Sequence, residues 1–352
     1  MKTPLTLLLL LLATATFAQT IRRVNADATV TGINVYTTLQ AAHDAAIAGD
    51  VLIVEPGASV GNLTCNKTLT IYGRGYFLDQ NSNYVALPNK SLSSTVAFIT
   101  INAANVKILG VEGGRFDING VSGVTISRCN FVSLKINGLS GSPVNYITIS
   151  QNYITGLGSN DFNLYAVAIA GAATGLVSNV SVTNNQIIGI MNINFLSTNS
   201  YTSSILFNQN TITGTYSGFG NLNPYNTIFM NNIFVSGQAI PFSNNNSSYF
   251  NNAFPAGSTI DSGMGSNNII VSNLNSQFIT NTGSIDNNYR IANGSVLKTA
   301  GNTSGEVGMF GGATPYVQYG IPAAPAVLKV RSDGVGNSTT PITLTLSAKS
   351  NN

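Results

Sequence analysis

Ile149-Ser150-Gln151-Asn152-Tyr153-Ile154 is one copy of the phrase that decides the fold: an apolar residue, Asn three positions later and a second apolar residue two positions after that. The spacing recurs as Val182/Asn185/Ile187, Phe207/Asn210/Ile212, Phe229/Asn232/Phe234 and Tyr249/Asn252/Phe254, and with Cys at the corner as Ile126/Cys129/Phe131. The corner positions 129, 152, 185, 210, 232 and 252 lie 23, 33, 25, 22 and 20 residues apart. Such a period is typical of a solenoid with loops of variable length.

Each part of the phrase has a physical role. The apolar flanks fit short strands whose side chains alternate between the interior and the surface. Asn tolerates the left-handed backbone that a sharp bend needs, so we expect that conformation at the corner itself. Stacked corners would let the amides hydrogen-bond along the axis. The sequence therefore predicts an all-β parallel β-helix with a structural ladder at Cys129, Asn152, Asn185, Asn210, Asn232 and Asn252.

Two coils align residue by residue. The segment 115–123 matches the segment 133–141 at an offset of 18, and Val106 and Ile108 match Val124 and Ile126 at the same offset. This alignment predicts that Asp117 lies directly beside Lys135 on a neighbouring strand.

The ends of the solenoid also carry signals. Residues 37–50 have helical spacing with a glycine stop signal at Gly49, and a buried strand follows from Val51. A helix in this place would cover the open end of the stack. Beyond the stiff segment 321–325, residues 327–330 and 342–346 alternate as two strands. We expect this tail to lie against the last coils or to form a small appendage.

Composition limits the function. Charged residues make up only 8% of the chain, which excludes an ordinary charged globular surface, and the hydrophobic share of 43% excludes disorder. The net charge of +3 comes without a Lys/Arg cluster, so nucleic acid and anionic membranes are not expected partners. Cys65 and Cys129 lie several coils apart and predict two buried free thiols rather than a disulfide.

The N-terminus reads as an export signal. Lys2 precedes an apolar run from Leu5 to Leu12 and a small-residue cleavage site that ends at Ala18. The run is too short to span a bilayer. We therefore expect a signal peptide over 1–18, a β-helix domain with its N-terminal cap over 19–320 and a C-terminal β tail over 321–352. The protein is then exported from a bacterium, either released or held at the cell surface, with no membrane span after cleavage.

The end segments resemble a known superfamily. The helix from Leu39 and the strand phrase at 49–57 resemble the N-terminal cap of the pectin-lyase-like right-handed parallel β-helix superfamily. The segment 305–316 is similar to the phrase that closes the helix in many secreted bacterial members. The resemblance covers the mature chain and implies the right-handed fold. It leaves activity open, because the superfamily includes lyases, hydrolases, epimerases and adhesins.

The sequence offers a charged patch as the candidate catalytic site. If the coils stack as the offset indicates, six charged residues gather on two or three neighbouring coils: Lys107, Glu112, Arg115, Asp117, Arg128 and Lys135. Asp117 would serve as a base or calcium ligand, and Lys135 or Arg128 would bind a carboxylate. The alternative is a solvated strip of paired charges. The Asp pairs of glycoside hydrolases in this superfamily are absent, and we interpret the one histidine, His43, as a surface or packing residue of the cap.

Loops provide a second candidate. The coil between corners 152 and 185 is longer than its neighbours, and long solenoid loops often line a binding face. Sugar-stacking rings and a hydrogen-bonding carboxylate would come from Asp161, Tyr165, Tyr201, Tyr216 and Tyr225, joined by Phe219. The alternative is that these rings only pack the loops down.

Three functional hypotheses remain open. The first is a non-catalytic extracellular β-helix that binds polysaccharide or a cell-surface glycan, or acts in adhesion, with no cofactor. The second is a polysaccharide lyase, epimerase or glycoside hydrolase that uses the patch near Asp117 and Lys135, with calcium as a candidate ion. The third is a structural rod, because uncharged flat β faces can self-associate.

Overall fold

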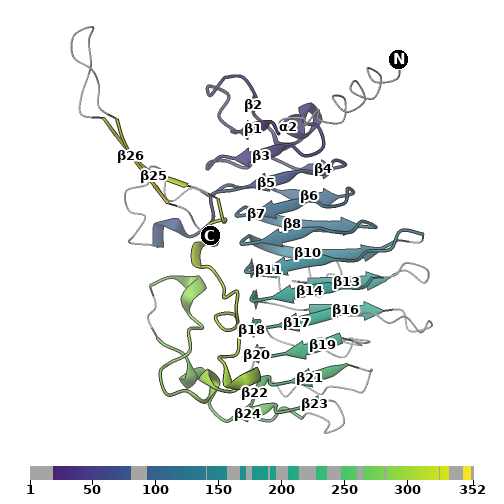
Figure 1. The fold of residues 1–352 in the computed structure, drawn as a ribbon, viewed down its shortest axis with the longest axis vertical. Coiled ribbons are helices and arrows are strands. Elements are labelled where there is room, and N and C mark those ends of the chain that lie inside the picture. Colours follow the sequence, from purple (N-terminus) through teal and green to yellow (C-terminus); the bar gives the residue numbers. More distant parts are fainter. Residues whose placement is uncertain are drawn as a thin grey trace, which may run out of the picture.

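The chain forms a stack of coils built from two long parallel sheets (Figure 1). The computed structural model describes residues 19–80, 93–139, 141–156, 167–171, 177–188, 191–195, 205–213, 227–235, 247–259, 265–280, 283–324, 326–332 and 344–349. The expected signal peptide, residues 1–18, lies outside them.

The strands of the first sheet contain the apolar residue that opens each phrase. In spatial order its strands are β2 (Val35–Tyr36), β1 (Ile21–Val24), β3 (Val51–Val54), β5 (Thr70–Tyr72), β7 (Lys107–Leu109), β9 (Thr125–Ser127), β11 (Ile147–Ser150), β14 (Val180–Thr183), β17 (Ile205–Asn208), β19 (Thr227–Met230), β21 (Ser248–Phe250) and β23 (Gly265–Ser266). All pairs are parallel, and each coil sits in register with the next: Ile126 pairs with Ile149, and Ile149 with Val182.

The second sheet follows each corner. Its strands are β4 (Leu63–Cys65), β6 (Phe98–Ile101), β8 (Glu112–Asn119), β10 (Asn130–Gly138), β12 (Tyr153–Ile154), β15 (Gln186–Ile188), β18 (Thr211–Thr213), β20 (Ile233–Phe234), β22 (Ala253–Pro255) and β24 (Ile269–Val271). β13 (Val167–Gly171) pairs with the second half of β10, and β16 (Met191–Phe195) pairs with β13. The predicted right-handed parallel β-helix is confirmed.

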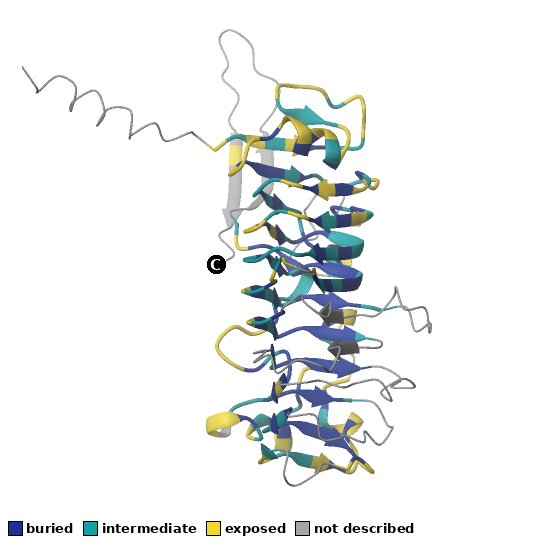
Figure 2. Cartoon of the chain, turned by 90° about the vertical axis from the view of Figure 1, so that its right-hand side faces the viewer, coloured by how far each residue is buried: buried dark blue, intermediate teal, exposed yellow. Residues whose placement is uncertain are grey.

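Alternation along the strands fills a narrow core. Inward residues from successive coils stack on one another, and Figure 2 shows them as a buried column along the molecule. Phe207, Phe229 and Tyr249 stack with ring centroids 5.1 and 5.0 Å apart, and Phe234 lies 4.8 Å from Phe254. Such repeating contacts favour one register for the whole stack.

The corner amides form a buried ladder. Asn152, Asn185, Asn210, Asn232 and Asn252 are each 0% exposed. The side-chain nitrogen of each donates to Oδ1 of the next, at 2.9–3.0 Å, and the series continues to Asn268. At the other end, the backbone N–H of Cys129 donates to Oδ1 of Asn152 at 2.9 Å.

The expected left-handed backbone at the ladder Asn is wrong by one position. Positive φ angles of 54–59° occur at the preceding residues instead, including Arg128, Gln151, Asn184, Gln209 and Asn231. The bend is made one residue early because the ladder residue must turn its amide into the interior. The left-handed residue can then project its side chain outward.

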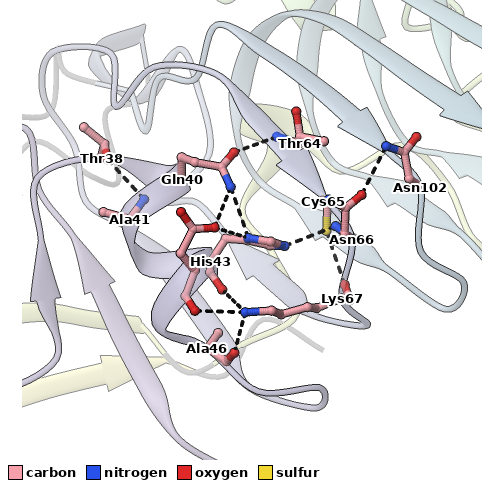
Figure 3. A network of polar contacts seen from close by, with 11 residues as sticks. Thr38, Gln40, Ala41, His43, Ala46, Thr64, Cys65, Asn66, Lys67 and Asn102 are labelled. Carbon is pink, nitrogen blue, oxygen red and sulfur yellow. Dashed lines mark hydrogen bonds and ion pairs between the residues drawn. The ribbon is translucent and has the colours of Figure 1, made fainter.

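A short helix covers the first coils. The predicted helix is present as α2 (Leu39–Ala45), with the Thr38 hydroxyl accepting from the Ala41 N–H. Figure 3 shows Lys67 at its C-terminal end, where Nζ donates to the carbonyls of His43, Asp44 and Ala46 at 2.8–2.9 Å. His43 is 3% exposed, and its Nε2 accepts the Asn66 N–H at 3.1 Å. It is a packing residue of the cap.

After β24 the chain does not stop at the last coil. Residues 302–322, which we call the strap, run back along the side of the stack toward earlier coils (Figure 1). Outward side chains of the left-handed corner residues hold the strap. Asn184 donates to the carbonyls of Met309 and Gly311, Gln151 to Pro315, and Arg128 to Ile321. The segment 305–316, expected to close the helix at its end, therefore lies along its side.

The tail forms a sheet of its own. β25 (Ala326–Ser332) pairs antiparallel with β26 (Leu344–Lys349), which begins two residues later than the predicted strand. Figure 1 places this hairpin beside the N-terminal coils rather than the last ones. Cys65 and Cys129 are free and buried, as the sequence predicts.

Candidate functional site

Three strands present a regular outer face of side chains. We call it the β6–β8–β10 face. The register pairs Phe98 with Arg115 and Arg115 with Ser133, and it pairs Thr100 with Asp117 and Asp117 with Lys135. The predicted neighbours Asp117 and Lys135 thus occupy matching positions on adjacent strands. Alternate residues of a strand share one side of the sheet, so Phe98, Arg115 and the buried Ser133 form one row across three coils, and the polar residues Thr100, Asp117 and Lys135 form the next.

One ion pair lies at the centre of this face. Arg115 donates to Asp117 through Nε at 2.7 Å and Nη2 at 2.8 Å, which is a bidentate pair within β8. The two side chains are 23% and 20% exposed, so the pair is partly desolvated. The Asp117 carboxylate is engaged by Arg115 and not by Lys135 among the described ion pairs. Each oxygen of the carboxylate therefore already accepts one hydrogen bond from Arg115.

The ion pair lines a shallow groove. Its volume is about 330 Å³, and it is lined by Phe98, Ile99, Thr100, Arg115 and Asp117. The Phe98 side chain is 53% exposed and offers an apolar surface beside the planar guanidinium and carboxylate. Asp117 is the carboxylate among the lining residues, whereas glycoside hydrolysis uses two.

A second amide ladder borders the groove. Asn137 donates to Oδ1 of Asn119 at 2.7 Å, Asn119 to Asn102 at 3.4 Å, and Asn102 to Asn66 at 3.2 Å. Unlike the corner ladder, these side chains are exposed or half-buried. An amide nitrogen has two hydrogens, and each donation along the ladder uses one of them. A row of amide groups is thus presented to solvent across four coils.

The predicted charged patch does not form one site. Lys107 lies on β7 of the other sheet, so it is separated from Asp117 by the body of the helix. Arg128 sits at a corner and is occupied by Gln151 and the Ile321 carbonyl of the strap. Glu112 begins β8, where it pairs with Asn130. Arg115, Asp117 and Lys135 share the β6–β8–β10 face, whereas Lys107 and Arg128 lie elsewhere, because stacking in sequence does not decide which side of a coil a residue faces.

The predicted loop site lies outside the described residues. This applies to each of its members: Asp161, Tyr165, Tyr201, Tyr216, Phe219 and Tyr225. Their role in ligand binding stays a prediction.

The described residues contain neither a cluster of metal-ligating side chains nor a membrane-spanning helix. In the described part of the chain, no three His, Cys, Asp or Glu side chains cluster as a metal site. Calcium at Asp117 stays a prediction. The described residues also contain no helix that is long and apolar enough to cross a bilayer.

Sequence reasoning missed two features of this molecule. The exposed ladder could have been predicted, since the 18-residue offset already places Asn119 beside Asn137. The corner row that binds the strap had a weaker signal, because Arg128, Gln151 and Asn184 share only a polar side chain before the ladder position.

Comparison with known proteins gives a likeness of fold. The sequence matches no protein-family model and no curated protein. Among solved structures the chain is similar to the crystal structure of pectate lyase Pel9A, at 14% identity and a TM-score of 0.40, over 83% of this chain and 97% of that one. The two long parallel sheets wound into one stack are the parallel β-helix that the sequence predicts.

Proposed function

We propose that the protein binds a polysaccharide through the β6–β8–β10 face, without catalysis at that face. The observation that carries this proposal is the combination, on one regular surface, of the exposed Phe98 ring, the Arg115–Asp117 pair and the outer amide ladder. Binding sites for small polar ligands combine an apolar surface with a few directed polar groups. A sugar ring matches it, since its C–H face can stack on Phe98 and its hydroxyls can bond to amides.

The face carries little charge, which suits a glycan of low charge. The Arg115 and Asp117 charges cancel at 2.7–2.8 Å, Lys135 adds one positive charge beside them, and amides donate and accept without net charge. The coil spacing, about 4.8 Å between strands, repeats the amides of the outer ladder along the helix axis. An extended chain lying along the axis could therefore meet an amide at each of these coils.

Calorimetric titration against a panel of neutral and uronate polysaccharides tests the proposal. Phe98→Ala and the double variant Asn119→Ala/Asn137→Ala should each weaken binding, since one net hydrogen bond or ring contact is worth about 0.5–1.5 kcal/mol, roughly a two- to tenfold change in affinity. The matched control is Tyr146→Ala, which removes a 70% exposed ring that does not line the groove. Equal affinities in all variants would remove this face from consideration.

The same incubations decide the catalytic alternative. Unsaturated-product absorbance reports a lyase, and new reducing ends report a hydrolase or lyase. Turnover that disappears in Asp117→Asn but survives in Tyr146→Ala would replace the binding hypothesis with an enzyme at this face. Sedimentation velocity on the same samples would reveal the self-associating rod.

Export belongs to the proposal as well. The leader-like segment 1–18 supports delivery outside the cytoplasm, where cell-surface glycans occur. N-terminal sequencing of the protein from its native host should begin at Gln19. An N-terminus that still includes Leu5–Leu12 would contradict cleavage.

A further inference from the structure

A buried carboxylate joins the strap to the coils. Asp286, in the short helix η6 (Ile285–Asn287), is 0% exposed. One oxygen accepts from the Ser284 hydroxyl. The other accepts the Tyr319 N–H at 2.7 Å and the Tyr316 hydroxyl at 3.3 Å. The Asp286 side chain therefore holds two residues of the strap.

The coils reach the same point through a phenol. Tyr316 is 4% exposed and its hydroxyl lies 2.5 Å from that of Tyr76, a fully buried residue that follows β5. The Tyr76 N–H donates to the Tyr319 carbonyl at 2.8 Å, and Tyr153 of β12 packs in the same cluster. Three segments distant in sequence, the coils, the η6 segment and the strap, thus meet around one carboxylate.

Among the described residues, no cation contacts Asp286. Its partners are Ser284, Tyr316 and Tyr319. The remaining titratable or charged groups around the junction are Tyr76 and Tyr153 from the coils, Cys129 and Arg128 from the adjacent corner, Asp79 of η1 (Leu78–Gln80), and Tyr289 and Arg290. Arg128 bonds to Gln151 and the Ile321 carbonyl, and Arg290 bonds to Gln318 and stacks over Phe310 at 4.4 Å.

Ionising a buried carboxyl group that has no cationic partner is unfavourable, because the charge loses its hydration. Burial accordingly raises the pKa of Asp286, although the hydrogen bonds from Ser284, Tyr319 and Tyr316 oppose the shift. The protonated carboxyl fits the cluster best, because its proton can be donated within the network while the second oxygen still accepts from the strap.

We propose that Asp286 is a pH-sensitive latch, which keeps the strap docked on the coils when it is protonated and loosens the strap when it ionises. Release would uncover the outward residues that the strap and the η6 segment bury, among them Tyr153, Thr211 and Ile233. The latch is independent of the glycan proposal, because it lies at the corners and not on the β6–β8–β10 face.

The direction follows from linkage. A carboxyl whose folded-state pKa is raised adds stability that is fully present below the pKa of the exposed group and is lost as pH rises through the folded-state pKa. Between those two values the opening equilibrium of the strap should grow about tenfold per pH unit, and it should level off above the folded-state pKa.

Hydrogen-exchange mass spectrometry of the full chain tests the latch. Protection factors for residues 302–322, corrected for the intrinsic effect of pH, should fall about tenfold per unit over that window in the wild type. Asp286→Asn keeps the shape and the neutral charge, so its protection should not vary with pH. The matched control is Asp79→Asn, an exposed acid on η1, which should keep the wild-type slope.

A second variant distinguishes the ionisation of Asp286 from a purely structural contribution of its hydrogen bonds. Tyr316→Phe removes one bond to the carboxylate but leaves the ionisable group, so it should lower protection at every pH while the slope persists. A wild-type strap whose corrected protection is flat with pH, or an Asp286→Asn strap that keeps the slope, would overturn the proposal.

Discussion

The backbone N–H and the side-chain amide of Asn152 both donate to the same atom, Oδ1 of Asn185, at 2.9 Å each. The Asn152 amide also donates to the Ile126 carbonyl at 3.0 Å. Each ladder residue repeats this arrangement on the next coil. The corner therefore replaces missing sheet hydrogen bonds with side-chain ones, which is why a fully buried polar row is tolerated in the core.

Removing one rung should be costly. In Asn185→Ala, the Asn152 N–H and amide lose their acceptor, and the Ile149 carbonyl loses the donor that lies at 2.9 Å. Each buried polar group left unsatisfied costs about 1–3 kcal/mol, so we expect urea unfolding followed by circular dichroism to show a loss of at least about 3 kcal/mol.

The matched variant at the head of the ladder is Cys129→Asn. The Cys129 sulfur lies 3.6 Å from the Ile108 carbonyl oxygen. This oxygen occupies the same position relative to Cys129 as the Ile126 carbonyl oxygen does relative to Asn152. An amide at this position would extend the ladder by one rung. We expect the free energy of unfolding of Cys129→Asn to lie within about 1 kcal/mol of the wild-type value. A loss as large as that of Asn185→Ala would contradict the idea that each ladder position contributes separately.

Both thiols should resist alkylation in the folded protein. Burial raises the pKa of Cys65 to about 11 and that of Cys129 to about 12, and the thiolate is the reactive form. At pH 8, iodoacetamide should modify both residues quickly in urea and neither in native buffer, as measured by mass spectrometry. Rapid labelling of Cys129 before Cys65 in the native state would show that the ladder corner opens.

Much of the fold could be predicted because it depends on spacing. The ladder positions combine a fixed offset with burial, so Asn152 and Asn185 were identifiable from the sequence. The bend itself was misplaced, because left-handed backbone is adopted here by Arg128 and Gln151, residues whose type gives no signal for it.

The site was predicted only in part for a related reason. An offset of 18 residues says which residues stack, and it correctly put Asp117 beside Lys135. It does not say which side of the coil they face, so Lys107 and Arg128 were wrongly grouped with them. The strap has no repeat, and its contacts are side chains bonding to backbone carbonyls such as that of Ile321, which leave no periodic trace.

The cap should depend on one ammonium group. Lys67→Met keeps the length of the side chain but removes three donors to the carbonyls at the end of α2. Because the site is half-buried, we expect a loss of about 1–3 kcal/mol, with faster hydrogen exchange in residues 39–46. Lys107→Met, at an exposed position on β7, is the control and should change neither quantity.

The strap should be displaced by one added methyl group. Gly320 has φ of +57°, and a Cβ on it would come within 2.1 Å of Cε1 of Tyr76 and 2.4 Å of the Arg128 carbonyl oxygen. Gly320→Ala therefore combines left-handed strain with a clash against buried atoms. Gly294→Ala separates the two effects, because Gly294 also has positive φ, +82°, but its Cβ would meet nothing within 4 Å.

Left-handed strain costs about 1–2 kcal/mol in either variant, and overpacking adds about 1–3 kcal/mol in Gly320→Ala alone. Hydrogen exchange should therefore rise across residues 302–322 in Gly320→Ala and stay near wild type there in Gly294→Ala. Since Gly320 touches Tyr76 and follows Tyr319, the first variant should also relieve the burial of Asp286 and flatten the pH response of the strap. Equal exchange in the two variants would mean that the strap is not held by this close approach.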